Sequence, residues 1–117
     1  MEYVSVAKGK YMKISPRKCR LVADLVRGKD AGEALSILKF SKRKKAAGMV
    51  YKVLNSAIAN AQNKSPNIDV DNLYISSIFV DQAPTLKRFR AAARGRGVRI
   101  LKRYSHITIY LNEREEK

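Results

Sequence analysis

The sequence predicts an α+β fold, in which three helices pack on a small antiparallel sheet and a long β-hairpin arm protrudes. Apolar residues recur at three- and four-residue spacing in the first half of the chain, as in amphipathic helices, whereas strand-forming residues gather in the second half. Between two strand-like segments lies a basic stretch, residues 82–104, that contains no acidic residue. The 117 residues suit one domain, residues 1–117, with this arm as part of it.

The first expected element is a strand over residues 3–12, which contain aromatic and β-branched residues but are interrupted by Gly9. A helix should follow, because Ser15 is a preferred N-cap and Pro16 is tolerated at the first helical position. Gly28 suits the left-handed position just beyond the end of this helix. The expected apolar stripe of the helix comprises Leu21, Val22, Leu25 and Val26.

Two further helices are expected before the strands of the second half. Asp30 and Glu33 have the spacing of an acidic capping box, which opens a short second helix. A basic run, residues 41–45, separates it from a longer third helix, which residues 63–67 end. The apolar stripe of the third helix comprises Ala47, Val50, Leu54, Ala57, Ile58 and Ala61.

Residues 73–80 and 105–111 are expected to be strands, and the second alternates apolar and polar residues. A connection as long as the one between them is unusual inside a compact domain. If both strands continue into it, they form a ribbon that turns near residues 91–97, and ten residues of strand would project by about 30 Å. The alternative interpretation of this segment is a disordered basic loop.

Positive charge dominates the composition, with 25 Lys and Arg against 10 Asp and Glu and a net charge of +15. Such a chain suits a polyanionic partner, and nucleic acid is the first choice. The arm carries eight of the cations: Lys87, Arg88, Arg90, Arg94, Arg96, Arg99, Lys102 and Arg103. The preference for arginine in this set favours bidentate phosphate contacts and stacking on exposed bases, as in RNA recognition.

Further RNA-binding candidates lie outside the arm. Arg17, Lys18 and Arg20 stand at a helix start, where the helix dipole already favours an anion. A bound phosphate would explain these cations, and a solvated basic face is the alternative. Asn60 and Asn63 have side chains that suit hydrogen bonds to RNA, although either suits an ordinary polar helix face equally well.

No enzymatic constellation is found in the sequence. His106 has no nucleophile or carboxylate at a suggestive spacing, and is expected on an exposed strand face where it can touch RNA. Cys19 stands between two cations that could lower its pKa, but a small helix residue without a catalytic role is the preferred interpretation. Residues 95–97 lack the third glycine and the following helix of a dinucleotide-binding loop. We therefore expect no enzyme, metal or cofactor.

The sequence also lacks the features of exported and membrane-spanning proteins. The N-terminus has no apolar signal segment, and no window approaches the length of a membrane span. We therefore expect a cytoplasmic protein without a membrane partner, monomeric when free.

Nearly the whole chain, residues 7–111, resembles the bacterial type of the large-subunit ribosomal protein twenty-two family. The segments that carry the resemblance are Ile14-Ser15-Pro16-Arg17-Lys18, Arg20-Leu21-Val22, Arg27-Gly28-Lys29, Lys52-Val53-Leu54, Ser56-Ala57, Ala59-Asn60-Ala61, Val80-Asp81, Pro84, Leu86-Lys87-Arg88, Lys102-Arg103 and Ser105-His106-Ile107-Thr108. This ordered set of segments is far more specific to the family than any one of its motifs.

The resemblance implies a structural constituent of the large ribosomal subunit that binds ribosomal RNA, supports subunit assembly and lines the nascent-peptide exit tunnel with its arm. Its implied partners are large-subunit ribosomal RNA, neighbouring ribosomal proteins and, transiently, the nascent peptide. The expected RNA-binding residues are Arg17, Lys18, Arg20, Arg27, Lys29, Asn60, Asn63, the eight arm cations, Ser105 and His106. The expected tunnel-facing tip comprises Leu86, Lys87, Arg88, Arg90, Ala91, Ala92, Ala93 and Arg94.

The chain departs from the family pattern at the tip of the arm. Ala91 and Ala92 stand where the family commonly has proline and arginine, and Gly97 stands where alanine is usual. These departures bear on tip shape and on sensing of the nascent chain.

A rival interpretation is a DNA-bending protein with a β-ribbon arm, which would need apolar wedges at the tip. The small residues here supply none.

Overall fold

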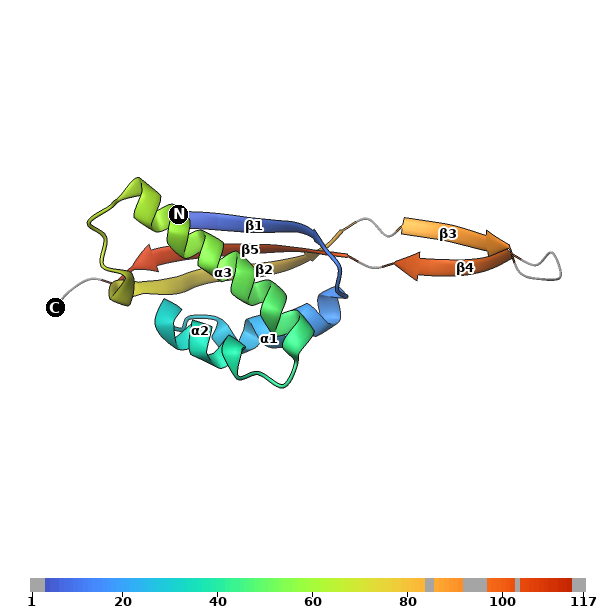
Figure 1. Ribbon diagram of the computed structural model, residues 1–117, viewed down its shortest axis with the longest axis horizontal. Coiled ribbons are helices and arrows are strands. Elements are labelled where there is room, and N and C mark those ends of the chain that lie inside the picture. The colour runs from blue at the N-terminus through green and yellow to red at the C-terminus, as the bar shows by residue number, and fades with distance from the viewer. Residues whose placement is uncertain (1–3, 84–85, 92–96, 103, 115–117) are drawn as a thin grey trace.

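Three helices cover one face of a three-stranded antiparallel sheet, and a two-stranded ribbon extends from one end of this body (Figure 1). The computed structural model describes residues 4–83, 86–91, 97–102 and 104–114, with the backbone alone for the second and third ranges. The elements are β1 (Ser5–Met12), α1 (Pro16–Val26), α2 (Ala31–Lys39), α3 (Lys44–Lys64), a 3-10 turn (Val70–Asn72), β2 (Leu73–Gln82), β3 (Leu86–Ala91), β4 (Gly97–Lys102) and β5 (Ser105–Glu113). The predicted α+β class is confirmed.

The sheet has the order β1-β5-β2, so the last strand of the chain lies at its centre. Alternate residues of β5, among them Ile107, Ile109 and Leu111, are buried beneath the helices. Ile109 pairs with Ala7 on β1 and with Ile78 on β2, both also buried. The predicted alternation of residues 105–111 is therefore confirmed, and it defines the covered face of the sheet.

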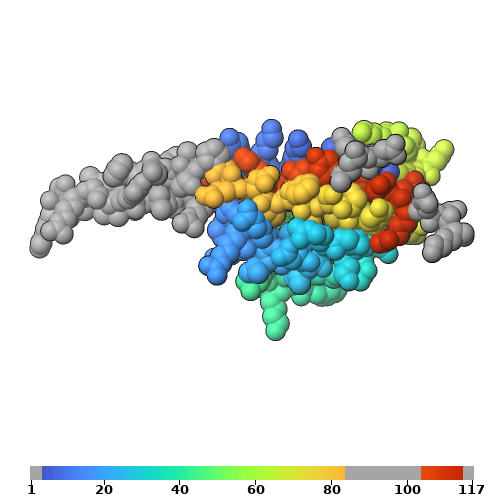
Figure 2. Space-filling model, turned by 180° about the vertical axis from the view of Figure 1, so that it is seen from behind, coloured from blue at the N-terminus to red at the C-terminus, as the bar shows by residue number. Residues whose placement is uncertain are grey.

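α1 and α3 pack on different strands of the sheet. α3 packs on β1 and β5, whereas α1 lies along β2 (Figures 1 and 2). On α1 the buried residues are Pro16, Cys19, Val22, Ala23 and Val26. The prediction that Leu21 and Leu25 share the buried stripe was wrong, because they are 46% and 51% exposed. Among the helices within the described ranges, none is long and apolar enough to cross a bilayer.

The ends of α1 lie where the sequence predicts them, but the expected side-chain caps are absent. Ser15 occupies the N-cap position and Gly28 is left-handed with φ of 78°, yet the Ser15 hydroxyl does not cap the helix. The capping box of α2 does not form either. The Asp30 carboxylate instead accepts a hydrogen bond from the Arg114 Nε atom, and the guanidinium lies 4.4 Å from the centroid of the Tyr74 ring. A tertiary ion pair between Arg114 and Asp30 thus takes the place of the predicted capping hydrogen bond.

β1 approaches α3 closely, and two side chains join them. The Ser5 hydroxyl donates to the Ala57 carbonyl oxygen at 2.8 Å, and Asn60 Nδ2 donates to the Val6 carbonyl oxygen at 3.0 Å. At Gly9 there is no room for a side chain, because an ideal Cβ would lie 2.7 Å from Val53 Cγ2. Gly9, which interrupts the strand-forming residues in the sequence, is therefore required by helix–strand packing.

The ribbon is a separate two-stranded sheet that follows β2 and precedes β5 along the chain. β2 and β5 remain paired as far as Gln82 and Ser105, and the Ala83 N–H then donates to the Tyr104 carbonyl oxygen at 2.9 Å. β3 and β4 are antiparallel, and the molecule measures 69 Å along its longest axis. This pairing is the one that the sequence predicts for a hairpin arm.

Candidate nucleic-acid interface

Basic and apolar residues are registered opposite one another along the ribbon. The pairs are Leu86 with Lys102, Lys87 with Leu101, Arg88 with Ile100, Phe89 with Arg99, and Arg90 with Val98. Like charges directly opposite one another would destabilise an antiparallel pair, and this register avoids them. Both strands contribute cations, and none of these pairs places two cations directly opposite one another.

Part of the predicted arm set falls outside the described residues. These residues are Ala92, Ala93, Arg94, Arg96 and Arg103. The strand positions of Leu86, Lys87, Arg88, Arg90, Ala91, Arg99 and Lys102 are given by the register above. Their contacts with RNA or with a nascent peptide remain predictions.

Arg17 and Lys18 are exposed in the first turn of α1, as a phosphate-binding role requires. Arg20 and Arg27 have a role that the sequence does not predict, since their guanidinium groups reach the free edge of β2. Arg20 Nε donates to the Val80 carbonyl oxygen at 3.1 Å, and an Arg27 terminal nitrogen donates to the Ile78 carbonyl oxygen at 3.0 Å. These bonds cover an edge strand and hold α1 against it.

The remaining RNA-binding candidates on the helices also include both exposed residues and a residue bound to the backbone of the body. Lys29 is exposed and lies 4.0 Å from a carboxylate oxygen of Glu33. Asn63 is exposed near the end of α3, whereas Asn60 is half-buried and bound to the backbone of β1. The alternative role of Asn60, as an ordinary structural residue, thus has a specific partner, and Lys29 and Asn63 remain available at the surface.

Ser105 and His106 stand at the root of the arm with different environments. The side chain of Ser105 is fully buried and its hydroxyl donates to the Ile14 carbonyl oxygen at 2.7 Å, so the prediction that it contacts RNA was wrong. His106 is half-buried on the open face of the sheet. Its Nδ1 atom accepts a hydrogen bond of 3.0 Å from the Tyr11 backbone N–H, which leaves Nε2 to carry the ring proton.

Tyr11 is a surface residue that sequence reasoning missed. Its backbone is left-handed, with φ of 54°, a conformation that is costly for a residue with a large side chain. The ring is 61% exposed and meets the His106 ring edge-on, with 4.7 Å between the centroids. Exposed aromatic rings are the side chains on which single-stranded RNA bases commonly stack. No local pattern in the sequence signals its positive φ.

Cys19 is buried in α1 and has no sign of activation. Burial raises the pKa of the Cys19 thiol to about 11, so the neighbouring cations do not lower it and the thiol is neutral near pH 7. The structure supports the interpretation of Cys19 as a small core residue.

Native Cys19 is expected to resist iodoacetamide at about pH 8, because the reacting species is the thiolate and the site is closed. The same chain unfolded in guanidinium chloride is expected to react fully. Mass spectrometry of the labelled protein measures both extents. Equal labelling rates for native and unfolded protein would contradict the burial.

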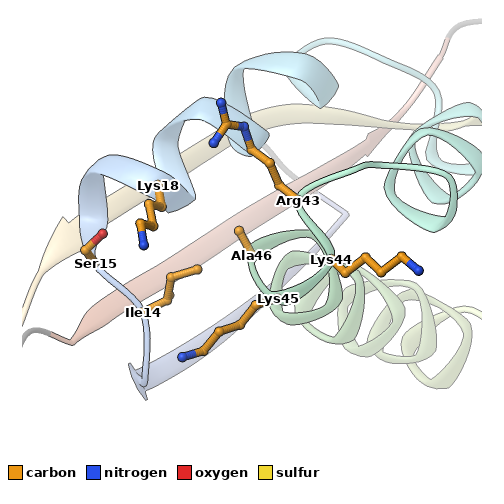
Figure 3. Close-up of a pocket in the computed structure, with 7 residues that line it drawn as sticks. All are labelled: Ile14, Ser15, Lys18, Arg43, Lys44, Lys45 and Ala46. Carbon is orange, nitrogen blue, oxygen red and sulfur yellow. The ribbon is translucent and has the colours of Figure 1, made fainter.

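The start of α1 faces the start of α3 across a cleft of about 350 Å³, which we call the basic cleft (Figure 3). Its lining residues are Ile14, Ser15, Lys18, Arg43, Lys44, Lys45 and Ala46. The sequence predicts residues 41–45 only as a separator between helices. α3 in fact begins at Lys44, which brings this run beside α1. The signal in the sequence is the density of cations, but their partner helix appears only in the fold.

Comparison with known proteins gives a match over most of the chain. Residues 7–112 match the family model described as ribosomal protein L22p/L17e. A protein of Syntrophotalea carbinolica named large ribosomal subunit protein uL22 is 56% identical over 108 residues, which cover 92% of this chain and 96% of that protein. A protein of the same name from Halothermothrix orenii is 54% identical over 116 residues, with 99% of each chain covered.

The matched region includes the helices, both strands of the ribbon and all of the sheet except the first two residues of β1 and the last residue of β5. The segments that suggested the resemblance lie within it, in the same order along the chain. This chain therefore belongs to the ribosomal protein L22p/L17e family.

Proposed function

We propose that this chain is a non-enzymatic, structural component of the large ribosomal subunit that binds ribosomal RNA. The observation that carries the proposal is the match to a ribosomal protein family over residues 7–112, which includes the basic ribbon. Its partners would be large-subunit ribosomal RNA and neighbouring ribosomal proteins, and its place the cytoplasmic ribosome. Support for subunit assembly follows from contacts with separate RNA segments through the arm and the body.

The finer part of the proposal is that the arm lines the nascent-peptide exit tunnel. A narrow, two-stranded ribbon can pass between RNA helices, and the register of β3 and β4 distributes cations along both strands. An isolated ribbon of this kind is marginally stable in water, so surrounding phosphates would stabilise it. The tip, from Leu86 to Arg94, would then meet the nascent peptide transiently.

The full chain is expected to co-sediment with large ribosomal subunits through a sucrose gradient in high salt, because a component buried in RNA is retained when surface-bound protein dissociates. Western blotting of gradient fractions locates the tagged chain. A hexahistidine-tagged unrelated basic protein serves as the control for adventitious binding. Recovery of the chain only in the soluble fractions would contradict the proposal.

The rival interpretation, a DNA-bending protein, is separated by a binding comparison. The free chain should bind refolded large-subunit ribosomal RNA more tightly than random duplex DNA, with affinity that falls steeply as salt rises. Filter binding at several salt concentrations measures both affinities. Equal affinities for the RNA and the DNA would favour the rival.

A further inference from the structure

The cations of the basic cleft have no ion-pair partner among the residues that the structure describes. Within the described part of the chain, no carboxylate lines the cleft. The ion pairs found in the described ranges join Arg27 to Asp24, Lys29 to Glu33, and Arg114 to Asp30. Lys18 comes from α1, whereas Arg43 and Lys45 come from the start of α3. Cations gathered from two helices repel one another, and an anion between them would relieve this repulsion.

The backbone adds to the positive potential of the cleft. The first amide groups of a helix lack intrahelical acceptors and form the positive end of the helix dipole. Neither Ser15 nor Arg43, at the N-cap positions of α1 and α3, caps its helix with its side chain, and neither first turn contains an acid. In α2, by contrast, Glu33 occupies the first turn. The two helix starts at the cleft therefore carry cations that oppose their dipoles.

The shape and the lining of the cleft favour an anion that also has an apolar part. Its floor is apolar, formed by the buried side chains of Ile14 and Ala46, while Lys18 and Lys45 extend on either side of Ile14 (Figure 3). Lys44 points away from the other labelled side chains in the same view. The Ser15 hydroxyl adds a donor at the rim. A phosphodiester fits this arrangement, because its oxygens accept from cations and a hydroxyl while the attached sugar covers the apolar floor.

We propose that the basic cleft binds a backbone phosphate of RNA, and that it does so beside the root of the arm. Ile14, on the floor of the cleft, accepts the hydrogen bond from Ser105, the first residue of β5 after the arm. A buried hydrogen bond thus joins the floor of the cleft to the start of β5, directly after the arm. This inference rests on the proposed RNA-binding function and adds a second attachment point, on the body.

The test compares two triple variants of the full-length chain. One is Lys18→Ala/Arg43→Ala/Lys45→Ala, which removes three of the four cations that line the cleft. The matched control is Lys42→Ala/Lys52→Ala/Lys64→Ala, which removes the same charge from exposed positions that do not line the cleft. Filter binding to refolded large-subunit ribosomal RNA measures the affinity and its salt dependence, and circular dichroism checks the fold of both.

The cleft variant is expected to bind at least about tenfold more weakly than the control variant, with a salt slope lower by about 0.7–0.9, as for one lost phosphate contact. Equal affinities and slopes for the two variants would overturn the inference, because only overall charge would then matter. If the unmodified chain itself does not bind the RNA, the proposed function fails and not the cleft alone.

Amide chemical shifts of the unmodified chain give an independent measurement that needs no variant. Titration with a short single-stranded RNA should shift the amides of Ser15, Lys18, Lys45 and Ala46, with saturation. Shifts elsewhere but none at these positions would count decisively against the cleft. Parallel titrations use inorganic phosphate, polyglutamate and phosphatidylglycerol vesicles. Equal binding of polyglutamate, or binding of vesicles alone, would replace RNA phosphate by a carboxylate or a lipid headgroup and overturn the assignment.

Discussion

Replacing residues 84–103 with Asn-Gly is expected to lower the affinity for large-subunit ribosomal RNA by on the order of 10³-fold at moderate salt, while the body remains folded. The exchange removes eight of the 25 Lys and Arg residues and no acid. Each lost phosphate contact also lowers the slope of log affinity against log salt by about 0.7–0.9. Filter binding over a salt series measures both quantities.

The structure offers a clean point for this exchange. Ala83 and Tyr104 are joined by a backbone hydrogen bond of 2.9 Å, so a two-residue type I′ turn can close the strands. The buried residues of the body, among them Ile78 and Ile109, lie outside the exchanged segment. Thermal unfolding followed by circular dichroism should therefore remain cooperative.

A full-length variant with the eight arm cations changed to glutamine is the matched control. It keeps the length of the arm and removes only charge. Similar affinity losses in both variants would assign the effect to charge, whereas a loss confined to the exchange would assign it to shape. An arm-exchanged body that no longer unfolds cooperatively would show that the arm is part of the fold.

Gly9→Ala is expected to lower the free energy of unfolding by about 1–3 kcal/mol, the range found for overpacked cores. The new Cβ would lie 2.7 Å from Val53 Cγ2, which is a methyl group of a stiff, buried side chain on α3. The sulfur of Met12 would be 3.1 Å away, but this flexible side chain can move. Urea unfolding measures the change.

Two control variants make this prediction specific. Gly48→Ala, on the exposed side of α3 with nothing within 4 Å of its ideal Cβ, should raise stability by about 0.4–1 kcal/mol. Val53→Ala removes the obstructing methyl group, so the double variant with Gly9→Ala should lose less stability than the sum of the two single changes. Strict additivity would mean that the glycine is not needed for this contact.

Local periodicity predicts most of the fold because it reflects the face that each element buries. The alternation of Ile107 and Ile109 and the spacing along α3 both follow this rule. Leu21 and Leu25 do not, since α1 presents its smaller residues Cys19 and Ala23 to the core. Close packing through small side chains is decided by the neighbouring helix and strand, so the sequence of α1 alone favours the wrong leucines.

The candidate site is predicted less completely. The sequence does not distinguish a cation or hydroxyl that faces solvent from one that donates to a backbone carbonyl. Arg20 and Arg27 reach edge carbonyls that are distant in sequence, and Ser105 is buried against Ile14. Arg43 and Lys45 are the opposite case, because they come to line a cleft with α1 only when the chain folds. Tertiary partners make these distinctions, and no residue spacing encodes them.

The central position of β5 has a consequence for folding during synthesis of the chain. β1 and β2 each pair with β5 alone among the strands of the sheet, and Ser5 pairs with Leu111 near the opposite end of the chain. The sheet therefore closes only after almost the entire chain has been synthesised. Such distant pairings fold slowly because a long loop must close first. The arm is thus synthesised before the strand that completes the sheet of the body.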